Sequence, residues 1–114
     1  MKVYGIPNCN TVKKATEWLK NNQNTFEFHD YKKKGITAEK LKEWSKQVGW
    51  EKLLNKKGTT WRTLSREEQQ KVADEKSAIE LMIKKPSVIK RPVIETDEKL
   101  LVGFDEEEYM NSFT

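Results

Sequence analysis

The sequence has only one cysteine, Cys9, and one histidine among its 114 residues. A single cysteine excludes an internal disulfide, and one cysteine with one histidine is too few for a Cys/His zinc site, so we expect no bound metal. No apolar run approaches the roughly 18 residues that a membrane span needs. The first residues, Met1 to Gly5, hold no apolar signal region, so we expect a cytoplasmic protein without membrane contact.

The composition is that of one folded domain. Hydrophobic residues make up 35% of the chain, charged residues another 35%, and four tryptophans are present. This apolar content is lean but sufficient for one core, and it excludes a disordered chain. We therefore expect a single domain over residues 1–114, and a monomer by default.

Positive charge is concentrated in the first half of the chain. Residues 1–57 carry a net charge of +7, and residues 58–114 carry −3. A basic half suits an acidic partner protein, a small anion or nucleic acid, or it is simply a solvated surface. Lys32–Lys34 precede Gly35 and are expected to form a loop. Since no aromatic residues interleave with these lysines, we expect no nucleic-acid partner.

The first third of the chain has the pattern of a strand, a helix and a parallel strand. Residues 3–6 predict a strand, and Pro7-Asn8 end it. A helix follows, capped by Asn10 or Thr11, with apolar residues at helical spacing. Residues 25–31 alternate and are aromatic, which predicts a second strand. Such a unit places its two strands parallel.

The rest of the chain predicts helices, then a hairpin and a last helix. From Thr37 to Lys85 only helical patterns occur, with Ser65 and Glu68 forming a capping box. Residues 92–96 and 100–102 predict a hairpin. The whole order resembles a thioredoxin-like (glutaredoxin-like) α/β core with a four-stranded mixed sheet. The core covers about residues 1–35 and 87–114, and the helical insert covers about residues 36–86.

Cys9 lies between the first strand and the first helix. The helix dipole and the free N–H groups at the helix start, including those of Asn10 and Thr11, favour a thiolate there. Val12 stands where a C-x-x-C motif has its second, resolving cysteine, so any redox cycle uses one thiol and needs an external thiol to resolve the adduct. Glutathione is the abundant cytosolic thiol. The alternative is a small buried hydrophobic cysteine.

Arg91-Pro92 opens the predicted third strand. In thioredoxin-like folds a cis-proline occupies this place and faces the active cysteine. On that resemblance Arg91 projects near Cys9, where a guanidinium binds an oxyanion or supports the thiolate. The following strand, through the backbone of Val93, would pair with the backbone of glutathione. The alternative for Arg91 is an ordinary surface residue.

Four segments together resemble a known family. They are YGIPNCNT at residues 4–11, FHDY at 28–31, LLNKKGTT at 53–60 and IKRPV at 89–93. Their order and spacing resemble the arsenate reductase and Spx family, and most of all its YffB-like branch. The resemblance covers nearly the whole chain.

The resemblance implies a role for several residues. Cys9 matches the nucleophile of the arsenate reductases, and Arg91 matches the arginine before the cis-proline. Two further anion-binding arginines of those enzymes correspond to Asn55 and Gly103, and a histidine corresponds to Gly5. Three nearby cations are candidate substitutes for the two arginines, and the sequence leaves open which of them faces the cysteine: Lys56, Lys57 and Arg62.

The resemblance and the residues favour a monothiol oxidoreductase with glutathione-dependent thiol reductase chemistry. Its catalytic residues would be Cys9 and Arg91, and Asn10, Thr11, Asn55, Pro92 and Val93 would bind substrate or glutathione. No cofactor is expected to be bound, and glutathione serves as co-substrate. Glutaredoxin or another protein is a further candidate partner. Two alternatives stay open: a non-catalytic Spx-like protein-binding module and a weak arsenate reductase.

Overall fold

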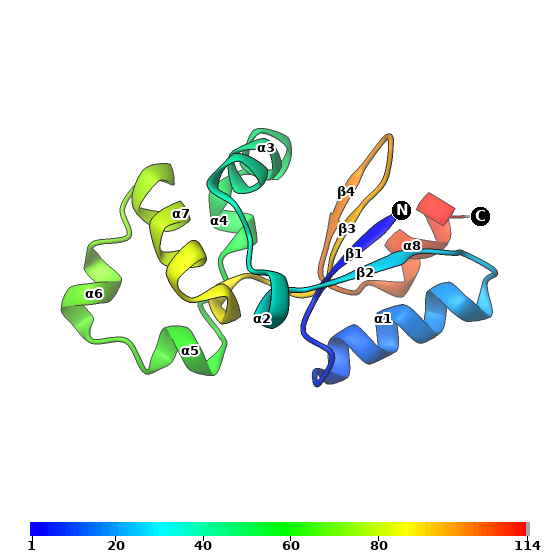
Figure 1. Ribbon diagram of the computed structural model, residues 1–114, viewed down its shortest axis with the longest axis horizontal. Helices are drawn as coiled ribbons and strands as arrows, with labels where there is room; N and C mark the ends of the chain where they lie inside the picture. Colours follow the sequence, from blue (N-terminus) through cyan, green and yellow to red (C-terminus); the bar gives the residue numbers. More distant parts are fainter. Residues whose placement is uncertain (114) are drawn as a thin grey trace. The chain divides into compact units, whose positions relative to one another are not determined.

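The computed structural model describes residues 1–113 and contains two compact units (Figure 1). The first, here called the sheet unit, comprises residues 1–30 and the chain from Arg91 onward. The second, called the helical unit, comprises Tyr31–Lys90 and begins five residues before the expected start of the insert. That the two units form one domain stays a prediction.

The sheet unit is a four-stranded mixed sheet with two helices. Its elements are β1 (Lys2–Gly5), α1 (Asn10–Asn21), β2 (Glu27–Asp30), β3 (Val93–Glu95), β4 (Leu100–Val102) and α8 (Glu106–Phe113). The strand order is β2-β1-β3-β4. β1 pairs parallel with β2 and antiparallel with β3, and β3 pairs antiparallel with β4. This topology confirms the predicted thioredoxin-like core.

One face of the sheet packs against α1 and α8. The buried cluster contains Val3, Ile94 and Leu101 from the strands, Ala15 and Leu19 from α1, and Tyr109 from α8. The ring of Trp18 meets that of Tyr109 edge-on, with 5.5 Å between centroids. Burial of such side chains contributes about 1.5–3 kcal/mol each. The cluster therefore fixes α1, and with it the helix start beside Cys9, against the sheet.

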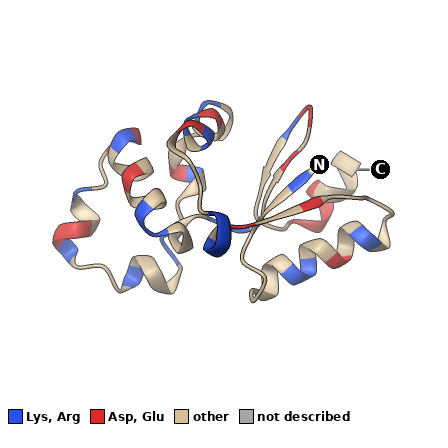
Figure 2. Cartoon of the chain, viewed as in Figure 1, with Lys and Arg blue, Asp and Glu red and all other residues tan. Residues whose placement is uncertain are grey.

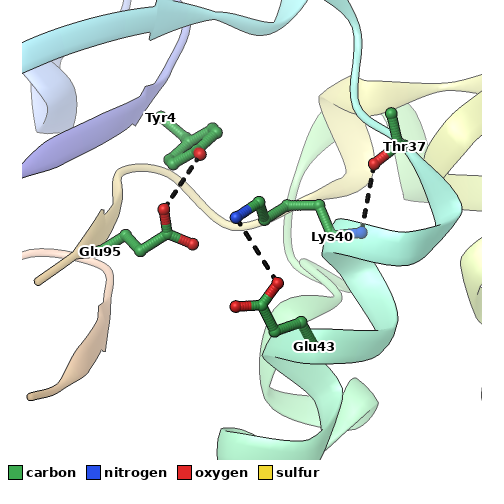
Figure 3. A network of polar contacts seen from close by, with 5 residues as sticks. All are labelled: Tyr4, Thr37, Lys40, Glu43 and Glu95. Carbon is green, nitrogen blue, oxygen red and sulfur yellow. Dashed lines mark hydrogen bonds and ion pairs between the residues drawn. The ribbon is translucent and has the colours of Figure 1, made fainter. Parts of the chain in front are cut away.

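The helical unit is built from short helices. They are α2 (Tyr31–Lys34), α3 (Ala38–Val48), α4 (Trp50–Leu53), α5 (Thr59–Arg62), α6 (Arg66–Gln70), α7 (Glu75–Lys84) and the 3-10 turn η1 (Pro86–Val88). Thr37 caps α3 by accepting a hydrogen bond from the backbone N–H of Lys40 at 3.2 Å, and Lys40 pairs with Glu43 at 3.6 Å (Figure 3). The predicted capping box of Ser65 and Glu68 is confirmed at α6.

Several local predictions were wrong. Lys32–Lys34 belong to the short helix α2 and not to a loop, as the uniformly basic turn in Figure 2 shows. The second strand is shorter than expected, because Tyr31 opens that helix. The N-cap of α1 is Cys9 and not Asn10 or Thr11, which are its first two residues.

Candidate active site

Cys9 is the N-cap residue of α1. Its backbone is extended, with φ −141° and ψ 125°, and its carbonyl accepts the first helical hydrogen bond from the N–H of Lys13 at 3.0 Å. The thiol is half-buried. An N-cap side chain lies over the unpaired N–H groups of the second and third helical residues. In this helix those residues are Thr11 and Val12.

The surroundings of Cys9 lower the pKa of its thiol. Burial is the largest single effect, and it acts in the opposite direction by disfavouring the charged form. The backbone N–H of Val12, hydrogen bonding from the Arg91 guanidinium and the backbone N–H of Thr11 each favour the thiolate. The positive charge of Arg91 adds to them, and the net pKa shift is downward. A lowered pKa raises the fraction of the nucleophilic form at neutral pH.

Arg91 and Pro92 lie where β3 begins. The Arg91-Pro92 peptide bond is cis, which confirms the expectation taken from the resemblance. Arg91 is half-buried, and Pro92 is buried. The carbonyl of Pro92 accepts a hydrogen bond from the N–H of Gly103 at 2.8 Å. The hydrogen bond between Pro92 and Gly103 therefore fixes the backbone next to Arg91 at the start of β3.

The structure does not favour a ligand contact at Val93. Its side chain is 0% exposed, and β3 lies between two paired strands. Val93 stands opposite Tyr4 of β1 and Val102 of β4. The carbonyl of Pro92 points at β4, where it accepts from the N–H of Gly103. Backbone groups of successive strand residues point to alternate sides, so the N–H and C=O of Val93 point at β1. The expectation that its backbone pairs with glutathione is corrected on this ground.

Asn55 belongs to the helical unit, where it follows α4. Its backbone N–H donates to the carbonyl of Val88 at 2.7 Å, and its side-chain oxygen accepts from the N–H of Lys57 at 3.2 Å. A Cβ placed on Gly58 would lie 2.7 Å from the side-chain nitrogen of Asn55. The Asn55 side chain is therefore engaged in shaping its own loop.

The three candidate substitute cations also lie in the helical unit. Lys56 and Lys57 follow Asn55 in this loop, and Arg62 ends α5; all three are exposed. The ammonium of Lys56 lies 5.6 Å from the ring centroid of Trp61. Which of the three faces Cys9 stays open.

The position matching the third family arginine, Gly103, has φ +85°. A side chain there is strained, because this backbone conformation favours glycine. The turn itself therefore opposes an arginine at this point of the last hairpin.

The one histidine packs against an aromatic ring. Tyr4 and His29 stand opposite each other on β1 and β2, with ring centroids 4.7 Å apart. The hydroxyl of Tyr4 donates to a carboxylate oxygen of Glu95 at 3.2 Å (Figure 3). His29 therefore packs against the ring of Tyr4.

Sequence reasoning missed one contributor, the backbone N–H of Val12. The sequence could have indicated it. With Cys9 as the N-cap, Val12 is the third helical residue, and an N-cap side chain commonly accepts a hydrogen bond from the N–H of that residue. Asn10 opens α1 and is exposed, and Thr11 contributes through its backbone as expected. The structure thus brings together Cys9, Thr11 and Arg91.

Two kinds of site are absent from residues 1–113. No three His, Cys, Asp or Glu side chains are grouped so as to hold a metal ion. Within the same residues, no helix combines the length and the apolar character needed to cross a membrane. At Cys9, a sulfur polarised by the helix start lies beside the Arg91 guanidinium, and such a sulfur can attack a disulfide sulfur or an oxidised anion.

Comparison with known proteins places the chain among proteins of this design. A sequence model of the ArsC family matches residues 4–112. The chain belongs to the ArsC family. The solved structure of the YffB protein superimposes with a TM-score of 0.94 at 43% identity, covering 99% of this chain and 98% of that one. An arsenate reductase (ArsC) related protein from Brucella melitensis is 48% identical, with a TM-score of 0.77 and coverage of 98% and 92%.

Curated ArsC-like sequences include a close and a distant relative. An uncharacterised protein of Haemophilus influenzae is 42% identical over 111 residues, which is 97% of this chain and 96% of that protein. The regulatory protein MgsR of Bacillus subtilis is 27% identical over 90% of this chain and 81% of its own. The relatives of this chain therefore include a protein named as related to arsenate reductase and a protein named for regulation.

Proposed function

We propose that this ArsC-family protein is a cytoplasmic monothiol oxidoreductase that reduces mixed disulfides of glutathione through Cys9. One observation carries the proposal: the thiol stands at the N-cap of α1, where two backbone N–H groups and the Arg91 guanidinium lower its pKa. A reducing, glutathione-rich compartment suits a single unpaired thiol.

The proposed cycle needs only one protein thiol. The Cys9 thiolate attacks the glutathione sulfur of a substrate disulfide, and the substrate sulfur leaves as a thiolate and takes up a proton. Cys9 is then disulfide-bonded to glutathione. A second glutathione thiolate attacks the glutathione sulfur of that bond, which yields glutathione disulfide and restores the Cys9 thiolate. Overall, the mixed disulfide and one glutathione thiol give the substrate thiol and glutathione disulfide, so the substrate sulfur is reduced at the expense of the second glutathione.

Each site residue has a defined task in this cycle. Arg91 stabilises Cys9 as an anion, both before attack and when Cys9 is the leaving group. The N–H groups of Thr11 and Val12 do the same from the helix start. In the proposal Asn10 and Pro92 help to bind glutathione.

The test uses the mixed disulfide of glutathione and 2-mercaptoethanol as substrate. Reduction is followed through NADPH consumption by added glutathione reductase. Cys9→Ser should lower turnover to the uncatalysed background while leaving the circular dichroism spectrum unchanged. Turnover that persists in the folded Cys9→Ser protein would exclude the mechanism.

The Arg91 variants then separate charge from geometry. Arg91→Gln should lower turnover more than Arg91→Lys, since lysine keeps the charge but not the planar fork of donors. Equal turnover in both variants and the native protein would show that Arg91 has no part in the cycle.

Arsenate reduction is a second candidate, favoured by the named Brucella relative and by Arg91 beside Cys9. Two positions count against efficient arsenate binding, because Gly103 has a left-handed backbone and the Asn55 side chain already holds its loop. We therefore expect turnover with arsenate and glutathione to be well below turnover with the mixed disulfide. The opposite ranking would make arsenate the substrate.

A protein-binding module without chemistry is the third candidate, favoured by the regulatory relatives. It requires no reactive thiol. An ordinary, unreactive thiol at Cys9 together with a stable protein complex would favour it over the enzyme.

A further inference from the structure

A groove of the sheet unit, lined in part by sequence neighbours of Cys9, has no part in the proposed cycle. It has a volume of about 270 Å³ and lies where α1 meets the β2 side of the sheet. Its lining comes from the cysteine loop, from α1, and from β2 with the residue before it: Pro7, Val12, Lys13, Thr16, Lys20, Phe26 and Phe28. Cys9 itself does not line the groove, but Pro7 and Val12 are two and three positions from it in the chain, and the backbone N–H of Val12 reaches its thiol.

The floor of the groove is apolar. Phe26 and Phe28 are half-buried and pack on the sheet unit's core cluster, and Val12 is 2% exposed. The hydroxyl of Thr16 donates to the carbonyl of Val12 at 3.0 Å, so it is already hydrogen-bonded within the helix. Small-molecule pockets typically have roughly 300–1,000 Å³. This smaller groove fits one apolar side chain better than a whole cofactor.

The rim of the groove is positive. Lys13 and Lys20 are both exposed, and neither forms an ion pair with another residue of the described chain. They are seven positions apart on α1, where blue bands mark the basic residues in Figure 2. Seven residues correspond to about 10.5 Å along a helix axis. The lining contains no acidic residue to neutralise the two ammonium groups.

We propose that this groove binds an acidic segment of the protein substrate, with an apolar side chain on the phenylalanines and carboxylates at Lys13 and Lys20. An extended chain advances about 3.3 Å per residue and places alternate side chains on one face. Two glutamates four positions apart, with a leucine midway, therefore span about 13 Å on one face, within reach of the two flexible lysines. The substrate class is a glutathionylated protein whose modified cysteine adjoins such a segment.

The inference rests on the proposed function, but binding can be measured without the chemistry. The Cys9→Ser protein serves as the unreactive host, and the probe is a fluorescein-labelled peptide containing Glu-Gly-Leu-Gly-Glu. Fluorescence anisotropy gives its affinity. Control peptides carry glutamine for both glutamates, or serine for leucine. Both should bind more weakly than the probe, because each lacks one of the two complementary features.

Lysine variants in the same host locate the site. Lys13→Gln and Lys20→Gln should each weaken binding about two- to five-fold, as expected for an exposed ion pair. Lys14→Gln is the matched control, since Lys14 is also exposed on α1, carries the same charge and does not line the groove. It should leave the affinity unchanged.

Several results would overturn the groove assignment. The first two are equal affinity for the probe and both control peptides, and an equal loss of probe affinity in Lys14→Gln and Lys20→Gln. The third is the absence of saturable binding up to about 1 mM peptide. The fourth is full displacement of the probe by S-methylglutathione, which would make the groove a glutathione site. Probe binding by the Cys9→Ser protein as predicted, together with no mixed-disulfide turnover by the native protein, would instead reject only the proposed function.

Discussion

Gly5 and Val12 should be energetically coupled, because they meet where β1 leads into the cysteine loop and α1. A Cβ on Gly5 would lie 2.9 Å from Cγ2 and 3.6 Å from Cγ1 of Val12. Val12 cannot move away easily, since its side chain is 2% exposed and β-branched side chains in helices keep one χ1 rotamer. The histidine that resembling arsenate reductases carry at this position would meet the same contact.

Gly5→Ala should therefore destabilise the protein. Overpacking of this kind costs about 1–3 kcal/mol. Loss of glycine freedom in the unfolded chain offsets about 0.4–1 kcal/mol of that. We expect a net loss of up to about 2.6 kcal/mol in the free energy of unfolding, measured by urea denaturation and circular dichroism.

A double-mutant cycle isolates the cause. Val12→Ala alone should cost roughly 2 kcal/mol, from two lost methyl groups and the space they leave. In that background Gly5→Ala should be neutral or stabilising, so the double variant is more stable than the sum of the single changes by about 1–3 kcal/mol. Gly5→Ala combined with Val102→Ala, on a strand not paired with β1, should be additive within about 0.5 kcal/mol. Additivity of Gly5→Ala with Val12→Ala would refute the steric argument.

Three further predictions test the site and its support. Arg91→Gln should raise the pKa of Cys9, so alkylation by iodoacetamide will need a higher pH than in the native protein; an unchanged pH profile would exclude the guanidinium as a cause. Thr37→Ala should cost about 1 kcal/mol in urea denaturation by removing the cap of α3, whereas Thr37→Ser should cost much less. Tyr109→Phe should cost about 0.5–1.5 kcal/mol, because its buried hydroxyl donates to the carbonyl of Gly103 at 2.8 Å; no loss of stability would show that this bond adds nothing net.

The elements of the sheet unit could be predicted from local patterns of apolar residues, prolines and turns in the sequence. Alternating apolar residues, the break at Pro7 and the turn around Asp97 predicted the strands, and their order predicted the mixed sheet. The periodicity of α1 placed Val12, Ala15 and Leu19 in the core, where all three are buried. These predictions succeeded because burial on one face imposes a period on the sequence.

The failures have equally local causes. Cys9 is a rare N-cap, and the polar Asn10 and Thr11 beside it carried the stronger capping signal, so the helix start was placed too late. Three adjacent lysines gave no apolar period from which to predict α2. Not every apolar residue of α8 is buried: Met110 is 51% exposed, whereas Tyr109 and Phe113 contact the ring of Trp18.

The site was predictable in type but not in detail. The position of Cys9 before a helix indicated a stabilised thiolate, and the resemblance supplied Arg91 as its partner. The contribution of the Val12 N–H to the Cys9 pKa could be predicted only from the true helix start. That the Val93 backbone does not face a ligand could be predicted only from its register between β1 and β4. Register and cap geometry are set by tertiary packing, which a single sequence does not display.

Ionisation of Cys9 links the site to stability. Because the pKa of this thiol is lower in the folded state, its ionisation favours folding at pH values above the unfolded pKa, and this contribution is lost as the pH falls through the folded pKa. The Cys9→Ser protein lacks the group and should lack this pH dependence.

The pKa of Cys9, from the pH dependence of thiolate absorbance near 240 nm with Cys9→Ser as the blank, tests the account most directly. Since Cys9 is the chain's one cysteine, the difference signal reports that thiol alone. The account predicts a pKa below the roughly 8.5 of an unperturbed thiol, and an increase in Arg91→Gln. A pKa at or above that value in the native protein would contradict a reactive thiolate held by the helix start and Arg91.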